Sequence, residues 1–157
     1  MIISLKEFLL TGKFGAISKG MTKDEIIAYL GKPVEERDFG SGISCLFYNG
    51  FEFQYWTKDG ELYSIQNDSI GNLFEDFGPY PINENTKVDI SFLCFGKPLS
   101  FGNLKQYLTE EKIMFQIVDK DEYDEIVLES GVTFDFKNHD VNQHNDELLL
   151  NGIRYKI

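Results

Sequence analysis

The chain repeats one pattern of residues, and this repeat constrains its fold more than any other feature. Residues 22–30 (TKDEIIAYL) and residues 100–108 (SFGNLKQYL) both begin with a hydroxyl residue, carry an aliphatic residue fifth and end in Tyr-Leu. Further along, residues 46–55 (LFYNGFEFQY) are similar to residues 127–136 (VLESGVTFDF). The first two segments are 78 residues apart and the second two are 81 apart. This similarity predicts two units that each consist of a helix followed by strands.

Each repeated helix carries the signals of a helix start. Thr22 is a suitable N-cap, and Glu25 three residues later completes a capping box. Gly31 then ends this helix. Ser100 is the matching cap of the second helix. The apolar spacing of residues 3–10 predicts a further short helix before the first unit.

Strands follow each helix and determine the fold class. Asn-Gly and Ser-Gly dipeptides between the apolar runs predict tight hairpin turns. The expected strands cover residues 34–39, 44–49, 51–56, 61–67, 88–95, 113–119, 125–129, 132–137 and 148–157. The sequence therefore predicts an α+β fold of two tandem helix-plus-antiparallel-strand repeats, with the helices packed on one face of a shared or abutting sheet.

The length of 157 residues favours a single domain. It divides into a first unit (1–68), a connector that includes one strand (69–98) and a second unit (99–157). The separation between equivalent residues of the two units grows to 86 at the last strand, where Glu61 aligns with Glu147. We therefore expect a longer loop before the last strand of the second unit.

The period of two in the first hairpin separates an aromatic face from a polar face. The aromatic residues are Phe51, Phe53 and Tyr55, and the residues between and after them are Glu52, Gln54 and Trp56. The aromatic face should pack on the helices, which leaves the polar face in solvent. Trp56 is then exposed unless the N-terminal helix or a curl of the sheet covers it. Because tryptophan is enriched among interface hot spots, Trp56, Glu52 and Gln54 are candidate partner-binding residues.

Five acidic residues occur among residues 119–125. A calcium-binding loop needs glycine at its sixth position and an acid at its twelfth. Counted from Asp119, these positions hold Asp124 and Ser130, so the run does not match such a loop. Two interpretations remain for this run. It is a solvated hairpin end, or it is an acidic patch in which Asp121, Glu122 and Asp124 attract a basic partner.

His139 and His144 share a polar stretch with Asp140 and Asp146, and together they could bind zinc. The spacing is not that of a helical pair, and long hairpin loops are commonly polar. We therefore expect no metal, cofactor or catalytic residue, and keep a small metal-dependent enzyme as an alternative. Cys45 lies in an apolar run without a basic neighbour that would activate it, which predicts a buried thiol.

The chain carries 26 acidic and 15 basic residues, a net charge of −11. Such a surface repels nucleic acid and anionic membranes, so we expect neither as a partner. It attracts a basic protein, although acidity also keeps a small protein soluble. Lys6 and Glu7 interrupt the apolar N-terminal residues, and no segment approaches the roughly 18 apolar residues that span a bilayer. These features predict a cytoplasmic location.

Residues 20–26 (GMTKDEI), running on to residues 30–33 (LGKP), resemble the opening of two groups of bacterial proteins. One group is the small outer-membrane assembly lipoproteins, which share a beta-lactamase-inhibitor-like fold. The other is a set of small cytosolic proteins associated with polymorphic toxin systems. The second group is more similar, because it also carries an E-L-x-x-I strand, here residues 61–65, and an S-G-V-x-F-x-F hairpin, here residues 130–136.

This resemblance implies an immunity protein, which binds and blocks a cognate toxin domain and has no catalytic residues. Combined with the charge, it predicts a cytosolic inhibitor that neutralises a basic toxin by occlusion. Two alternatives remain open: a non-catalytic assembly or homodimeric binding module, and a metal-dependent enzyme that uses His139 and His144.

Overall fold

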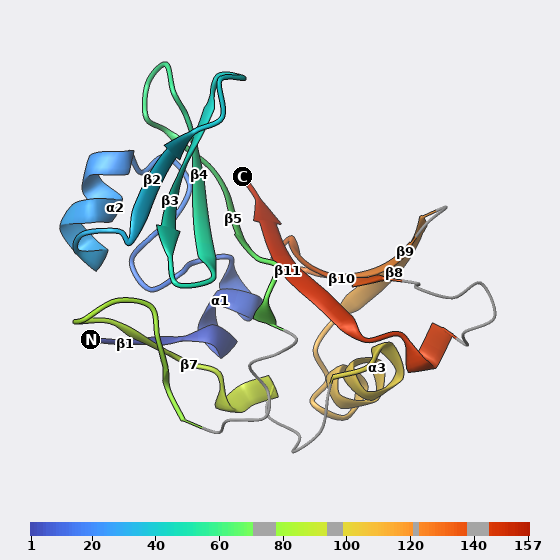
Figure 1. The fold of residues 1–157 in the computed structure, drawn as a ribbon. Helices are drawn as coiled ribbons and strands as arrows, with labels where there is room; N and C mark the ends of the chain where they lie inside the picture. The colour runs from blue at the N-terminus through green and yellow to red at the C-terminus, as the bar shows by residue number, and fades with distance from the viewer. Residues whose placement is uncertain (71–77, 94–98, 121–122, 138–144) are drawn as a thin grey trace.

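The computed structural model describes residues 1–70, 78–93, 99–120, 123–137 and 145–157. Helices and strands of the described residues form an α+β fold, as the sequence predicts (Figure 1). In chain order the elements are β1 (Ile2–Ser4), α1 (Leu5–Thr11), α2 (Lys23–Leu30), β2 (Glu35–Asp38), β3 (Ile43–Tyr48), β4 (Phe51–Trp56), β5 (Leu62–Asn67), β6 (Tyr80–Pro81), β7 (Lys87–Asp89), the 3-10 helix η2 (Ser91–Leu93), α3 (Phe101–Glu110), β8 (Phe115–Lys120), β9 (Tyr123–Leu128), β10 (Val132–Lys137), the 3-10 helix η3 (Asn145–Glu147) and β11 (Leu150–Lys156).

One antiparallel sheet of eight strands joins the two predicted units. Its strand order is β2-β3-β4-β5-β11-β10-β9-β8. The first half, β2 to β5, comes from the first unit, and the second half, β8 to β11, comes from the second (Figure 1). The halves meet where β5 pairs with β11, and Gln66 lies opposite Arg154 near the middle of this pairing. The units therefore share a continuous sheet.

The two halves repeat the same contact between the start of the helix and the last strand. In the first half, the amide of Lys23 donates to the carbonyl of Gly60 at 2.7 Å. In the second half, the amide of Phe101 donates to the carbonyl of Leu148 at 2.8 Å. In each half the first turn of the helix is therefore joined to the residues just before the last strand.

The structure corrects the predicted alignment of the last strands. Thr22 forms an isolated bridge with Glu61, and Ser100 forms the equivalent bridge with Leu149. The offset is therefore 88 residues at this point, not 86. Glu61 corresponds to Leu149, because Glu147 lies in η3, which precedes β11.

Alternate residues of the strands build one core on the face that the helices cover. The side chains of α2 and α3 that enter this core include Ile26, Leu30 and Leu104, each at most 1% exposed. On the sheet, the predicted aromatic face is buried: Phe51, Phe53, Tyr55, Val132, Phe134 and Phe136. The predicted packing of the helices on one face is therefore confirmed.

The N-terminal residues also belong to the core. The expected helix over residues 3–10 begins two residues later, at Leu5, because Ser4 caps it by accepting a hydrogen bond from the amide of Glu7 at 3.2 Å. The preceding β1 pairs in parallel with β7, and β6 completes a small three-stranded sheet. The strand expected at residues 88–95 is shorter in the structure, because β7 ends at Asp89 and η2 begins at Ser91. Among the described residues, no helix is both long and apolar enough to span a membrane.

Candidate partner-binding face

The second face of the sheet, opposite the core, carries the predicted polar residues of β4. Glu52 and Gln54 are half-buried on this open face, and Trp56 is 42% exposed. The N-terminal helix α1 packs into the core on the other side, where Leu5, Phe8 and Leu9 are buried. It therefore does not cover Trp56, and the tryptophan is available to solvent.

Trp56 forms a ring pair with Tyr63, whose centroid lies 4.8 Å away at an interplanar angle of 54°. Tyr63 reaches the open face because it is the extra residue of a β-bulge, where the β4–β5 register shifts after Gln54. The β10–β11 register shifts in the same way after Asp135, and Asn151 is the extra residue there. The bulge is common to both halves, but the second half carries no ring at the position of Tyr63.

Three further side chains extend this ring pair into what we call the aromatic patch. Directly paired residues on neighbouring strands share a face. Ile43 pairs with Trp56, and the amide of Phe39, which is 46% exposed, donates to the carbonyl of Ile43 at 3.1 Å. Phe47 pairs with Glu52 on the same face. The aromatic patch consists of Phe39, Ile43, Phe47, Trp56 and Tyr63.

The thiol of Cys45 lies between Ile43 and Phe47 on the same strand and is fully buried. Burial raises the pKa of this thiol to about 12, with a smaller contribution from the carboxylate of Glu52. The thiol is therefore neutral at physiological pH and is a poor nucleophile. The prediction of a buried Cys45 is confirmed.

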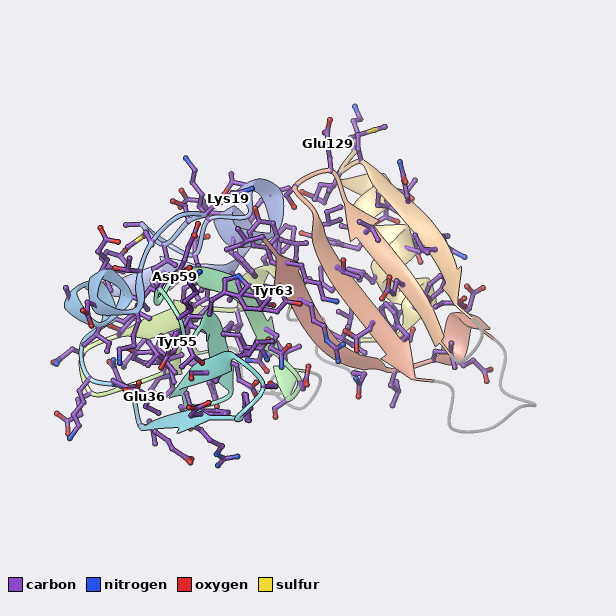
Figure 2. All side chains as sticks on the ribbon, turned by 90° about the horizontal axis from the view of Figure 1, so that it is seen from above. Lys19, Glu36, Tyr55, Asp59, Tyr63 and Glu129 are labelled. Carbon is purple, nitrogen blue, oxygen red and sulfur yellow. The ribbon has the colours of Figure 1, made fainter. Side chains whose placement is uncertain are left out.

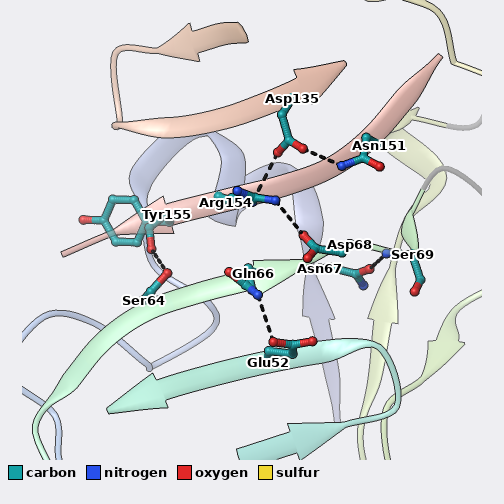
Figure 3. A network of polar contacts seen from close by, with 10 residues as sticks. All are labelled: Glu52, Ser64, Gln66, Asn67, Asp68, Ser69, Asp135, Asn151, Arg154 and Tyr155. Atoms are coloured by element: carbon teal, nitrogen blue, oxygen red, sulfur yellow. Dashed lines mark hydrogen bonds and ion pairs between the residues drawn. The ribbon is translucent and has the colours of Figure 1, made fainter. Parts of the chain in front are cut away.

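A polar network continues the open face from the first half into the second (Figure 3). The amide of Gln66 donates to the Glu52 carboxylate at 2.8 Å. Across the junction, Arg154 lies 3.4 Å from Asp68 and 3.4 Å from Asp135. The side chain of Asn151 donates to Asp135 at 2.8 Å, so the side chains at the centre of this face are held by their neighbours.

The acidic run does not extend the aromatic patch. Asp124 is only 8% exposed, because it pairs with the buried Phe136 and lies on the same face of β9 as the buried Ile126. The prediction that Asp124 belongs to an exposed acidic patch is therefore wrong. Asp121 and Glu122 lie outside the described residues.

The two predicted binding features also lie in different halves of the sheet. Four inter-strand steps separate β4 from β9, which is about 19 Å at roughly 4.8 Å per step. Figure 2 shows Tyr63 on the first half and Glu129 at the turn between β9 and β10 in the second half, at the opposite end of β9 from the acidic run. The aromatic patch and the strand that carries Asp124 therefore lie in different halves of the sheet.

His139 and His144, the residues of the alternative metal site, lie outside the described residues. Their predicted companion Asp146 is described, and it accepts a hydrogen bond from the ammonium group of Lys105 at 2.8 Å. Within the part of the chain that the structure describes, no group of three or more His, Cys, Asp or Glu residues is arranged to hold a metal ion.

Comparisons with protein-family models, curated proteins and solved structures give no match. The functional interpretation therefore rests on the residues of this chain. Of the five residues in the aromatic patch, sequence analysis identified only Trp56 and missed Phe39, Ile43, Phe47 and Tyr63.

Proposed function

We propose that this chain is a non-catalytic immunity protein, which binds a basic bacterial toxin domain and neutralises it by occlusion. The observation that carries the proposal is the ring pair of the exposed Trp56 with the half-buried Tyr63 on the open sheet face. Tryptophan and tyrosine are enriched among the few residues that dominate the energy of protein interfaces. An exposed cluster of apolar side chains is also a common mark of an interaction site.

The aromatic patch is well ordered for binding because its side chains stand on paired strands. The ring contact restrains Trp56 and Tyr63, and the guanidinium of Arg37 lies 5.1 Å from the ring centroid of Phe47. Side chains that are already restrained lose less conformational entropy when they bind. The aromatic patch can therefore act as an anchor within a larger contact area.

The net charge of −11 indicates the chemistry of the partner. A basic protein is attracted over long range, and this attraction raises the rate of association. A toxin that acts on nucleic acid has a basic substrate site, which an acidic protein can cover. The resemblance of the repeated helix and hairpin motifs to immunity proteins of toxin systems supports the same function.

The proposal is tested by co-expressing the chain with the product of the neighbouring gene and measuring rescue of growth. For the purified pair, Trp56→Ala should weaken binding by about 2 kcal/mol, or about thirtyfold in Kd. Ile2→Ala is a matched control, because Ile2 is an exposed apolar residue (66%) on the small sheet. The association rate should also fall as salt is added.

Two results would contradict the proposal. One is a lack of growth rescue by a chain that is expressed and folded. The other is an equal loss of affinity in the Trp56→Ala and Ile2→Ala variants, since this would place the interface elsewhere.

A further inference from the structure

The two edges of the eight-stranded sheet differ in how strongly they discourage pairing with another strand. At the β2 edge all four residues are charged and exposed (EERD). Two ion pairs also order this edge: Arg37 with Glu35 at 2.7 Å, and Lys23 with Glu36 at 2.8 Å. Charged residues on a short edge strand are a common protection against unwanted strand pairing.

The β8 edge is less protected, because its first four residues (FQIV) are uncharged. It is six residues long (FQIVDK), and Ile117 within it is 50% exposed. Met114, directly before the strand, is 70% exposed. Among the described residues, the only strand that pairs with β8 is β9. In an antiparallel ladder, alternate residues of an edge strand direct their N–H and C=O groups away from the sheet, so β8 can accept a further strand.

Two hollows lie beside the N-terminal end of β8. One of about 400 Å³ is lined in part by Gln116 and Val127, which belong to the open face. The other, of about 210 Å³, lies toward the end of α1. Met114, Leu128 and Glu129 line both of them. An added strand turns successive side chains to opposite faces, so its side chains can enter both hollows.

The charge around β8 indicates which kind of segment fits. Residues 110–118 and 125–129 contain four acidic residues and one basic residue, a net charge of −3. A second copy of the chain carries the same charge and is repelled, whereas a segment rich in lysine or arginine is attracted.

From these observations we propose that β8 binds an extended segment of a basic protein, which adds to the sheet as a ninth strand. Main-chain hydrogen bonds to β8 supply affinity, and the two hollows and the acidic surroundings supply selectivity. This site lies in the other half of the sheet from the aromatic patch. It does not depend on the function proposed above.

The test uses a dye-labelled octapeptide of alternating lysine and valine with blocked ends, and binding is measured by fluorescence polarisation. Saturable binding is expected, together with slower amide hydrogen exchange in β8. A peptide that is N-methylated at alternate residues keeps its charge but loses main-chain donors, so it should not bind. This comparison uses the unmodified protein and does not depend on the folding of any variant.

Variants at the two edges provide a second test. Ile117→Lys should weaken binding by about tenfold, because it places a like charge beside the peptide and removes an apolar contact. Val34→Lys is the matched control, since Val34 is an exposed apolar residue (70%) directly before β2. It changes the net charge equally and should leave binding unaltered.

Three results would overturn the proposal. Equal weakening in both variants would show that binding depends only on the overall charge. Equal binding of the N-methylated peptide would show that main-chain hydrogen bonds are not used. Dimerisation of the protein that protects β8 from hydrogen exchange would show that a second copy of the chain occupies this edge.

Discussion

Phe14 connects the N-terminal residues to the sheet, so its replacement should reduce the stability of the whole domain. Its side chain is fully buried. Its ring centroid lies 5.5 Å from that of Phe8, 5.0 Å from that of Phe51 and 5.3 Å from that of Phe53. Phe51 and Phe53 belong to β4, the strand whose opposite face carries Trp56.

The size of the effect follows from this packing. Truncation of a buried phenylalanine to alanine destabilises a protein by about 3–5 kcal/mol. Because Phe14 contacts three rings, we expect a loss of about 4 kcal/mol for Phe14→Ala, within a total stability of about 5–15 kcal/mol. In urea, with a slope of about 2 kcal/mol per molar, the midpoint should fall by about 2 M. The protein should still be folded without denaturant.

The measurement is urea unfolding followed by circular dichroism and by tryptophan fluorescence, which reports on Trp56. Leu10→Ala is the control, because Leu10 lies nearby in the chain but is 43% exposed, and it should cost less than about 1 kcal/mol. A loss below about 1 kcal/mol for Phe14→Ala would refute the reasoning. So would two separate transitions, because the N-terminal residues would then unfold independently of the sheet.

Three further predictions concern other parts of the fold. Burial raises the pKa of the Cys45 thiol from 9.0 in the unfolded chain to about 12 in the folded protein, so the folded state loses stability as the pH rises from about 9 toward 12. In urea titrations over this range, the stability of the wild type should fall relative to that of Cys45→Ala. Gly12→Ala and Gly40→Ala both place alanine at a φ of +72°, and this backbone strain should lower the stability of each variant by about 1–2 kcal/mol. Only at position 12 does the new Cβ also lie close to the side chain of Tyr155, at 2.8 Å. Gly12→Ala should therefore have the lower melting temperature of the two. Asn103→Glu should complete the capping box of α3 and raise the free energy of unfolding by about 0.5 kcal/mol. An unchanged far-ultraviolet spectrum is the control that the fold is the same.

The parts of the fold that depend on neighbouring residues were predictable from the sequence. The capping box of α2 forms as expected, because Thr22 and Glu25 need only each other. The turn at Asn49-Gly50 also forms, and both residues adopt positive φ, at 44° and 94°. In contrast, the pairing of β5 with β11 joins residues about 90 positions apart. No local signal specifies such a contact, and the sequence left open whether the sheet is continuous.

The candidate site was predicted in part for the same reason. Trp56 was found because alternation in β4 is regular. Tyr63 was missed because the bulge interrupts the alternation of β5, although the odd spacing of the buried Leu62 and Ile65 is a signal of a bulge. Asp124 was misplaced because the acidic run was interpreted by composition alone. Its even spacing from the buried Ile126 assigns it to the same face.

Comparison of equivalent positions in the two halves separates the scaffold from the binding surface. On the core face the halves match, since Phe53 and Phe134 are both fully buried at the same place in their hairpins. On the open face they differ, and Tyr63 corresponds to Asn151, which bonds to Asp135 instead of to a ring. The bulge forms with either residue, so the fold does not require an aromatic side chain there. A half-buried ring that the fold does not require is consistent with the binding role that we propose for the open face in the first half of the sheet.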